Sequence, residues 1–276
     1  GDNNLSLDAG ASGNITADKS ITGGGVFTVV DGAVQKYSGV VTVDSLDIKD
    51  ATTSVTLDGA LTSAGAVNID SGGTIAINAA ASGSTFDIDA TGKTTIAAAG
   101  DITASGAVTF GANKSGTLTT SGDIDTSNDN VTFTRAVTLG GAVDIDTNTG
   151  AGNILFSSTV ATGDNNLSLD AGASGNITLS GALTGGGNLT VRDGAVQSYQ
   201  ALTVDSLDIQ DATTSVTLDG DVTTETTLDI NTLTGKLIQN AKVDAGTSVD
   251  YDAVTIGINE SIKSGTTIDI DTSGTT

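Results

Sequence analysis

One stretch of sixteen residues occurs twice in the chain without a single change. GDNNLSLDAGASGNIT fills residues 1–16 and returns at residues 163–178. The similarity continues beyond this stretch, since DGAVQ at 31–35 matches DGAVQ at 193–197. Self-similarity at a fixed period is typical of repeat architectures, in which each unit packs against its neighbours rather than forming a separate globule.

The offset between the copies defines a supermodule of residues 1–162 and an incomplete second supermodule of residues 163–276. Both contain short stretches that alternate polar and apolar residues, such as Asn4-Leu5-Ser6-Leu7 and Ala142-Val143-Asp144-Ile145 in the first and Asn166-Leu167-Ser168-Leu169 in the second. Alternation with period two indicates β-strands. These stretches return about every 20 residues, which is the step of a solenoid coil. We therefore predict one continuous solenoid.

The residue types favour strands throughout. Val, Ile, Leu and Thr dominate, and β-branched residues fit a pleated surface. Almost all acidic residues are Asp, which favours turns and strand ends, whereas the helix-tolerant Glu occurs only at positions 225 and 260. No stretch has the spacing of an amphipathic helix. The chain is predicted to be all-β.

Two or three short strands per coil, joined by Gly, Asn, Asp and Ser corners, describe a parallel β-helix. We expect a right-handed coil, because parallel crossovers are almost always right-handed. About fourteen coils at the inter-strand spacing of ~4.8 Å would extend on the order of 65 Å. The complete absence of Pro agrees, because a Pro inside a coil would remove a hydrogen bond between coils. A β-sandwich is the alternative fold, but it does not explain the 20-residue step.

Composition excludes several functions. The chain has no Cys or His, which rules out disulfides, Cys/His metal sites and Ser-His or Cys-His relays. A net charge of -23 makes nucleic acid an unfavourable partner, and no apolar run is long enough for a membrane span. We expect any export signal to lie outside these residues.

Pairs of aspartates recur on strands predicted to face outward. Stacked coils would bring carboxylates close enough for Ca²⁺, with Asp87, Asp89, Asp250 and Asp252 as the candidate ligands. Paired carboxylates are also what glycoside hydrolysis uses. The interpretation we favour is that these charges solvate the molecule and keep copies apart. We therefore predict no catalytic residue and no bound cofactor, with Ca²⁺ as an open alternative.

An enzyme is not expected. The two arginines, Arg135 and Arg192, look isolated in the sequence, and position 30 in the first copy holds Val where the second copy holds Arg192. No long loop interrupts the repeat to build a cleft, whereas active sites usually depend on such irregular segments.

The triplet Asn-x-Ser/Thr recurs along the chain. It would allow glycosylation on a secreted surface, but it also arises from the strand pattern itself. The eight asparagines in this setting are Asn4, Asn14, Asn113, Asn130, Asn166, Asn176, Asn188 and Asn259.

The segment NLSLDAGASGNITLSGALTGGGNLTV at 166–191 resembles the repeats of filamentous haemagglutinin-type exoproteins, the large adhesins of two-partner secretion in Gram-negative bacteria. The resemblance implies a right-handed β-helical shaft that is extracellular or carried on the cell surface. Neither the family's secretion domain nor a receptor-binding region is recognisable here, so an internal shaft segment is expected. Any host or cell-surface glycan would then bind elsewhere in the parent protein.

Two functions follow from this reading. The first is a stiff structural shaft of an adhesin-like protein. The second is a self-assembling extracellular filament or sheath subunit, whose partners are copies of itself joined end to end. Both the first and last repeats lack a polar cap, which is the sequence feature that favours the second. A polysaccharide-active β-helix enzyme is the least expected function.

Overall fold

The computed structural model of the chain describes residues 3–111 and 116–274. Every regular element in these residues is a β-strand, and all the strands that pair run parallel to one another. The fold is an all-β parallel solenoid of about 13 coils of roughly 20 residues. This confirms the predicted fold class. The coil number is one below the expectation because some coils are longer, such as the one that separates the paired residues Thr94 and Leu118.

The contacts divide the chain into two compact units. Unit 1 comprises Gly1–Ser127 and Phe133–Val137, and unit 2 comprises Asn128–Thr132 and Thr138–Thr276. This division lies inside the first supermodule and therefore does not follow the sequence repeat. The supermodule boundaries, and the continuity of one solenoid across them, stay predictions.

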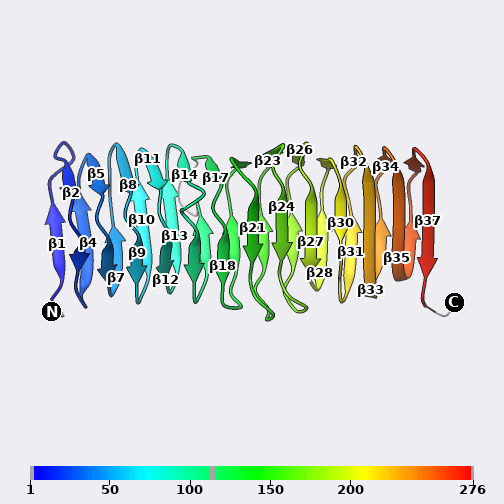
Figure 1. The fold of residues 1–276 in the computed structure, drawn as a ribbon, viewed down its shortest axis with the longest axis horizontal. Helices are drawn as coiled ribbons and strands as arrows, with labels where there is room; N and C mark the ends of the chain where they lie inside the picture. The colour runs from blue at the N-terminus through cyan, green and yellow to red at the C-terminus, as the bar shows by residue number, and fades with distance from the viewer. Residues whose placement is uncertain (1–2, 112–115, 275–276) are drawn as a thin grey trace. The chain divides into compact units, whose positions relative to one another are not determined.

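Unit 1 has three ladders, and each coil contributes one strand to each ladder (Figure 1). The first ladder contains β1 (Leu5–Asp8), β4 (Val26–Asp31), β7 (Ser45–Ile48), β10 (Val67–Ser71), β13 (Phe86–Ala90) and β16 (Val108–Phe110). The second contains β2 (Ile15–Ala17), β5 (Val34–Tyr37), β8 (Ser54–Leu57), β11 (Thr74–Ile77), β14 (Thr94–Ile96) and β17 (Leu118–Thr120). The third contains β3 (Ile21–Thr22), β6 (Val41–Val43), β9 (Leu61–Ser63), β12 (Ala81–Gly83), β15 (Ile102–Ala104) and β18 (Ile124–Thr126).

Unit 2 repeats this arrangement of three ladders. One contains β21 (Val143–Asp146), β24 (Leu167–Asp170), β27 (Leu189–Asp193), β30 (Leu207–Ile209), the first parts of β33 (Thr227–Gln239) and β35 (Ser248–Ile258), and β37 (Thr267–Thr272). The next contains β22 (Ile154–Phe156), β25 (Ile177–Leu179), β28 (Val196–Tyr199), β31 (Ser215–Leu218) and the second parts of β33 and β35. The last contains β23 (Val160–Gly163), β26 (Leu183–Gly185), β29 (Leu202–Val204), β32 (Val222–Thr224), β34 (Val243–Ala245) and β36 (Ile262–Ser264). The strands β19 (Val131–Phe133) and β20 (Val137–Leu139) hold residues of both units.

The apolar residues form the core by stacking in register. Ile48 pairs with Ile69, and Ile69 pairs with Ile88, and all three are fully buried. Backbone groups are satisfied between coils, as where the Leu46 N–H donates to the Ala66 carbonyl at 3.0 Å. Because nearly every strand needs such bonds on both sides, the coils tolerate no Pro.

The two Gly-Gly-Gly segments, Gly23–Gly25 and Gly185–Gly187, are corners of close approach. A Cβ atom on Gly25 would overlap the backbone of Asn3 in the adjacent coil, and a Cβ atom on Gly187 would overlap Asn165 in the same way. Only glycine leaves room for coils to stack at the inter-strand spacing at these two positions. In the part of the chain that the structure describes, no helix is long and apolar enough to cross a membrane.

Candidate functional site

Unit 2 contains a column of four aspartates on adjacent strands. Asp208 pairs in register with Asp229, Asp229 with Asp250, and Asp250 with Asp269. Adjacent strands lie ~4.8 Å apart, so these carboxylates stack at that repeat. Partial burial and the neighbouring carboxylates raise the pKa of Asp229 and of Asp250. Like charges opposite one another on adjacent strands are destabilising, so this column opposes folding at neutral pH.

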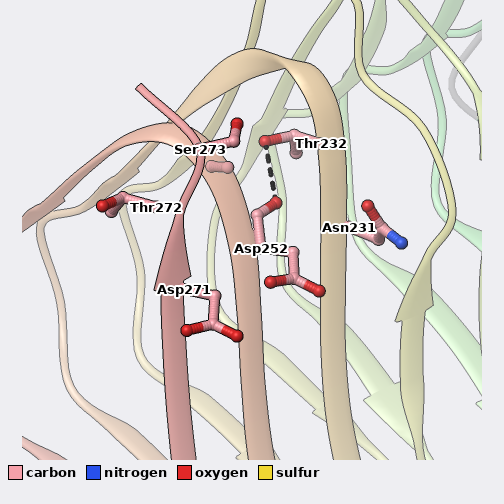
Figure 2. Close-up of a pocket in the computed structure, with 7 residues that line it drawn as sticks. Asn231, Thr232, Asp252, Asp271, Thr272 and Ser273 are labelled. Carbon is pink, nitrogen blue, oxygen red and sulfur yellow. Dashed lines mark hydrogen bonds between the residues drawn. The ribbon is translucent and has the colours of Figure 1, made fainter. Parts of the chain in front are cut away.

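A second polar row lies two residues further along the same strands. Asn231, Asp252 and Asp271 pair in register on β33, β35 and β37, and Figure 2 shows them around a pocket of about 360 Å³. The Thr232 hydroxyl donates to the Asp252 carbonyl at 3.3 Å at the edge of this pocket. Within the described residues, the Asn231 Oδ1 atom is buried without a hydrogen-bond partner. The pocket is therefore rich in oxygen atoms.

Arg192 neutralises another acidic group in unit 2. Its guanidinium donates two hydrogen bonds of 2.9 Å to the Asp144 carboxylate and one of 3.2 Å to Asp170, and lies 3.5 Å from Asp146. The hydrogen bonds from Arg192 to Asp144, together with the attraction of Asp144 and the hydrogen bond and attraction of Asp170, raise the pKa of the guanidinium. The three carboxylates come from two adjacent strands, β21 and β24, so Arg192 joins three consecutive coils.

A β-bulge explains how Arg192 reaches these groups. The pairing of β24 with β27 shifts between Leu169 and Asp170, and the pairing of β1 with β4 shifts at the equivalent place. A bulge adds one residue to one strand and re-aims its side chain. The added residue is Arg192 in β27 and Val30 in β4, where the Val side chain is left 40% exposed. Both copies therefore contain the β-bulge, but only the second copy has a charged residue at the added position.

Arg135 lies in the interior of unit 1. Its guanidinium donates to Thr94 Oγ1 at 3.2 Å, to the Ile88 carbonyl at 3.3 Å and to Asp89 Oδ1 at 3.4 Å. The Arg135 and Asp89 side chains are each only 2% exposed. Burial lowers the pKa of Arg135 although Asp89 and Asp87 oppose this. A Cβ on Gly111, whose φ is +83°, would overlap the guanidinium, so glycine there makes room for it.

The expectation that the two arginines are isolated is therefore wrong, since both pair with aspartates. The sequence contained one signal for the buried arginine. Val131, Phe133, Arg135 and Val137 follow the alternation of core positions, so Arg135 stands where an apolar residue is expected. The sequence contained no comparable signal for the contacts of Arg192, because its partners Asp170 and Asp144 are 22 and 48 residues away.

Each tyrosine is buried with its hydroxyl bonded to a buried glutamine. The Tyr199 hydroxyl donates to Gln197 Oε1 at 2.8 Å, and the Gln197 amide donates to the Asp211 carbonyl at 2.7 Å. Tyr37 and Gln35 repeat this arrangement in unit 1. Burial raises the pKa of both phenols. These groups fix the core and are not available to stack on a sugar.

The recurring asparagines join consecutive coils. Asn4 Oδ1 accepts from the Val26 N–H at 3.0 Å, and Asn176 Oδ1 accepts from the Val196 N–H at 3.1 Å. Asn14, Asn130 and Asn166 accept in the same way. The triplet therefore has a structural role at these corners, while Asn113 lies outside the described residues.

The four candidate Ca²⁺ ligands are placed differently. Asp250 and Asp252 lie on the outer surface of unit 2, as predicted, and Asp87 is half-buried in unit 1. Asp89 was predicted to face solvent but is buried beside Arg135, which supplies the positive charge that a cation would have supplied. In residues 3–111 and 116–274, no group of three or more acidic side chains is arranged to hold a metal ion. Ca²⁺ binding at Asp87, Asp250 and Asp252 stays a prediction.

The chemistry of these groups is structural. Within the described residues, each carboxylate–arginine group and each Gln–Tyr pair is used to connect strands or coils. Comparison with protein-family models, with curated proteins and with solved structures finds no match. The fold and its ladders therefore define the class, a β-solenoid repeat scaffold, and the family resemblance of the 166–191 segment stays a prediction.

Proposed function

We propose that the chain is a structural repeat shaft of a secreted or cell-surface, adhesin-like bacterial protein, in which it acts as a stiff scaffold rather than as an enzyme. The observation that carries this proposal is the use of side-chain chemistry to join coils. Arg192 holds strands of three coils together, and asparagines bond to the coil that follows them. The net charge of -23 supports solubility outside a cell.

Location and exposure test this proposal directly. An antibody against the purified chain should label intact cells of the source organism, or their culture medium. Labelling that appears only after the cells are permeabilised would contradict a surface or secreted shaft.

Mechanics provides a second, independent test. A coil-by-coil scaffold pulled from its two ends should lengthen in steps of about one coil, on the order of 70 Å of extended chain each. A single cooperative step for a whole unit would contradict it. Incubation with a panel of polysaccharides should release no new sugar ends, and turnover of any of them would favour the enzyme.

A self-assembling subunit is the second candidate function. It is favoured by the way coils stack, in parallel and with apolar residues in register, as where Val143 pairs with Leu167 and Ile145 with Leu169. The same pairing between coils of two copies would join them. Concentration-dependent association of the purified chain would support this function, and a monomer at every concentration would contradict it.

A further inference from the structure

Three asparagines of unit 2, Asn130, Asn166 and Asn176, belong to Asn-x-Ser/Thr triplets and are exposed. The Oδ1 atom of each accepts from a backbone N–H of the next coil, at 2.8 Å for Asn130 and at 3.1 Å for Asn166 and for Asn176. Within the described residues, none of the three Nδ2 atoms donates a hydrogen bond. One atom of each amide is therefore used to join coils, and the other is left on the surface.

Strand alternation places the remaining two residues of each triplet. The middle residue is buried in the core, and the Ser or Thr that follows it faces outward and is half-buried. The buried residues are Val131, Leu167 and Ile177, and the outward ones are Thr132, Ser168 and Thr178. The asparagine and the hydroxyl group of each triplet thus lie on the same outer surface.

One column of asparagines separates two kinds of amide. Asn130, Asn153 and Asn176 precede strands of three successive coils, and the Asn176 N–H donates to Asn153 Oδ1 at 2.9 Å. Asn153 also donates its own Nδ2 to Asn130 Oδ1 at 2.9 Å. Asn153 is followed by Ile154-Leu155 and so lies outside any triplet. In this column, the asparagines of the triplets are the ones whose Nδ2 atoms are free.

Spacing leaves room for a bulky group at both of these asparagines. Adjacent coils are ~4.8 Å apart, so Asn130 and Asn176 are separated by roughly 10 Å. Asn166 has a triplet asparagine on the adjacent coil, since the Asn188 N–H donates to its Oδ1 at 3.1 Å. Asn188 is half-buried, and its Oδ1 also accepts from the Ser206 hydroxyl. Of this pair, Asn166 is therefore the accessible site.

We propose that Asn130, Asn166 and Asn176 carry N-linked sugars, added by a glycosyltransferase of the source cell from a sugar activated as a diphosphate ester. The Nδ2 atom attacks C1 of the sugar, a C–N bond forms, and the bond from C1 to the diphosphate oxygen breaks. Nδ2 loses one proton to a base of the transferase, and nothing is oxidised or reduced. The side chain remains an amide, so Oδ1 keeps its bond to the next coil. This inference rests on the proposed surface or secreted location.

Asn259 provides the contrasting triplet. Its Nδ2 donates to Asn240 Oδ1 at 2.8 Å, and the Asn240 amide donates in turn to Asp219 at 2.8 Å. A sugar on Asn259 would need the atom that holds Asn240. We therefore expect Asn259 to stay unmodified although it has the same triplet.

Peptide mass spectrometry tests the assignment on the chain purified from the surface or the culture medium of the source organism. Trypsin cleaves after Lys and Arg, so Asn130 falls in peptide 115–135, Asn166 and Asn176 in peptide 136–192, and Asn259 in peptide 243–263. Fragmentation that keeps sugars attached should locate them on the three assigned asparagines and not on Asn259. Masses that differ by one sugar would indicate stepwise transfer from nucleotide sugars, and one uniform larger mass would indicate transfer of a finished oligosaccharide from a lipid carrier; both support the proposal.

Two results would overturn it. Surface-exposed chain without sugar on the three asparagines would overturn the modification and leave the scaffold function standing. Equal occupancy of Asn259 would show that the triplet alone selects the sites and that the bonding of Nδ2 does not. Chain found only inside the cells is a different result, which would contradict the proposed function itself.

A pair of variants expressed in the source organism tests one site more closely. Thr178→Ala removes the hydroxyl of the Asn176 triplet, whereas Thr178→Ser keeps it, and both retain Asn176 and its bond from the Val196 N–H. The sugar on Asn176 should be lost in Thr178→Ala and kept in Thr178→Ser. Asn166, in the same tryptic peptide, should remain modified in both and serves as the internal control. A sugar that stays on Asn176 in Thr178→Ala would overturn its assignment to the triplet.

Discussion

The buried glutamine and arginine side chains of unit 1 each have specific partners within reach. A coil is so small that a buried side chain lies next to the backbone of its own coil and of the next one. Gln35 therefore reaches the carbonyl of Asp50, fifteen residues away. Arg135 reaches Thr94, Ile88 and Asp89 at once. Buried polar groups are tolerated when they are bonded, and removing one partner is costly.

The buried ion pair makes a strong prediction. Arg135→Met should lower the free energy of unfolding of unit 1 by about 3–5 kcal/mol, because it leaves Asp89 buried without its counter-charge. Arg135→Met combined with Asp89→Asn should recover a large part of this loss. Urea unfolding, followed by amide exchange in β13 and β14, measures both. Equal stability of the single and double variants would contradict the pair's role.

The arginine at the bulge makes a weaker prediction, because its side chain is 35% exposed. Arg192→Val, which installs the residue of the first copy, should destabilise unit 2 by about 1 kcal/mol, after allowance for solvent screening. The loss should shrink in high salt. Lys263→Val is the control, since Lys263 and Asp244 form a more exposed pair, for which no measurable change is expected. If urea unfolding gave the same change in stability for both variants, the ion pairs of Arg192 would stabilise unit 2 no more than an exposed ion pair does.

Strands of three to five residues are too short to be stable alone, and they depend on the ladder that each extends. Register along a ladder then decides which outward side chains meet. In unit 1 the row contains Asp47, Asn68 and Asp87, and the Asn68 amide donates to Asp47 at 3.0 Å. In unit 2 the corresponding kind of row has four aspartates in succession. In unit 1 the Asn68 amide lies between the carboxylates of Asp47 and Asp87, so a hydrogen bond takes the place of the repulsion between neighbouring aspartates that occurs in unit 2.

This contrast predicts that Asp229→Asn stabilises unit 2 at pH 7 by about 0.5–1 kcal/mol. The folded pKa of Asp229 is raised above its ordinary value of 3.8, so the folded state favours the protonated carboxyl. The destabilisation is therefore complete above the folded pKa and disappears as the pH falls through it towards 3.8. The advantage of Asp229→Asn should disappear over the same pH window in urea unfolding.

Asp164→Asn is the control for this variant, because Asp164 is exposed and lies outside the column. Asp164→Asn should leave the stability of unit 2 unchanged both at pH 7 and at the low end of this pH window. A stabilisation by Asp229→Asn that persists at low pH would show that charge repulsion is not its cause.

On the scale of the whole molecule, the sequence allowed the fold to be predicted because the solenoid repeats one simple pattern. Alternation located strands such as Phe86–Ala90, and the 20-residue step located the coils. The candidate site was harder, because pairing across coils joins residues far apart in the sequence. Asp87 and Asp89 are two residues apart and were assigned to the same face, yet only Asp89 is fully buried. Its environment depends on Arg135, and alternation within one strand carries no information about that partner.

A solenoid held together by contacts between neighbouring coils should survive the loss of one entire coil. Residues 207–227 contain β30, β31 and β32, one strand from each ladder of unit 2. Their deletion would join Ser206 to Leu228, which occupies the same register position as Leu207. β27 would then pair with β33, placing Leu189 on Leu228, and the core would close without a gap.

We expect this deletion variant to fold, with amide protection retained in β27 and β33 and a urea m-value lowered in proportion to the surface removed. Deletion of residues 207–216 is the control. It removes fewer residues but ends within β31, so every later strand would meet the wrong partner and core residues would turn outward. Amide protection in β33 should therefore be lost in the smaller deletion and kept in the larger one. The opposite order, or equal loss in both, would mean that stability in unit 2 is not transmitted from each coil to its neighbour.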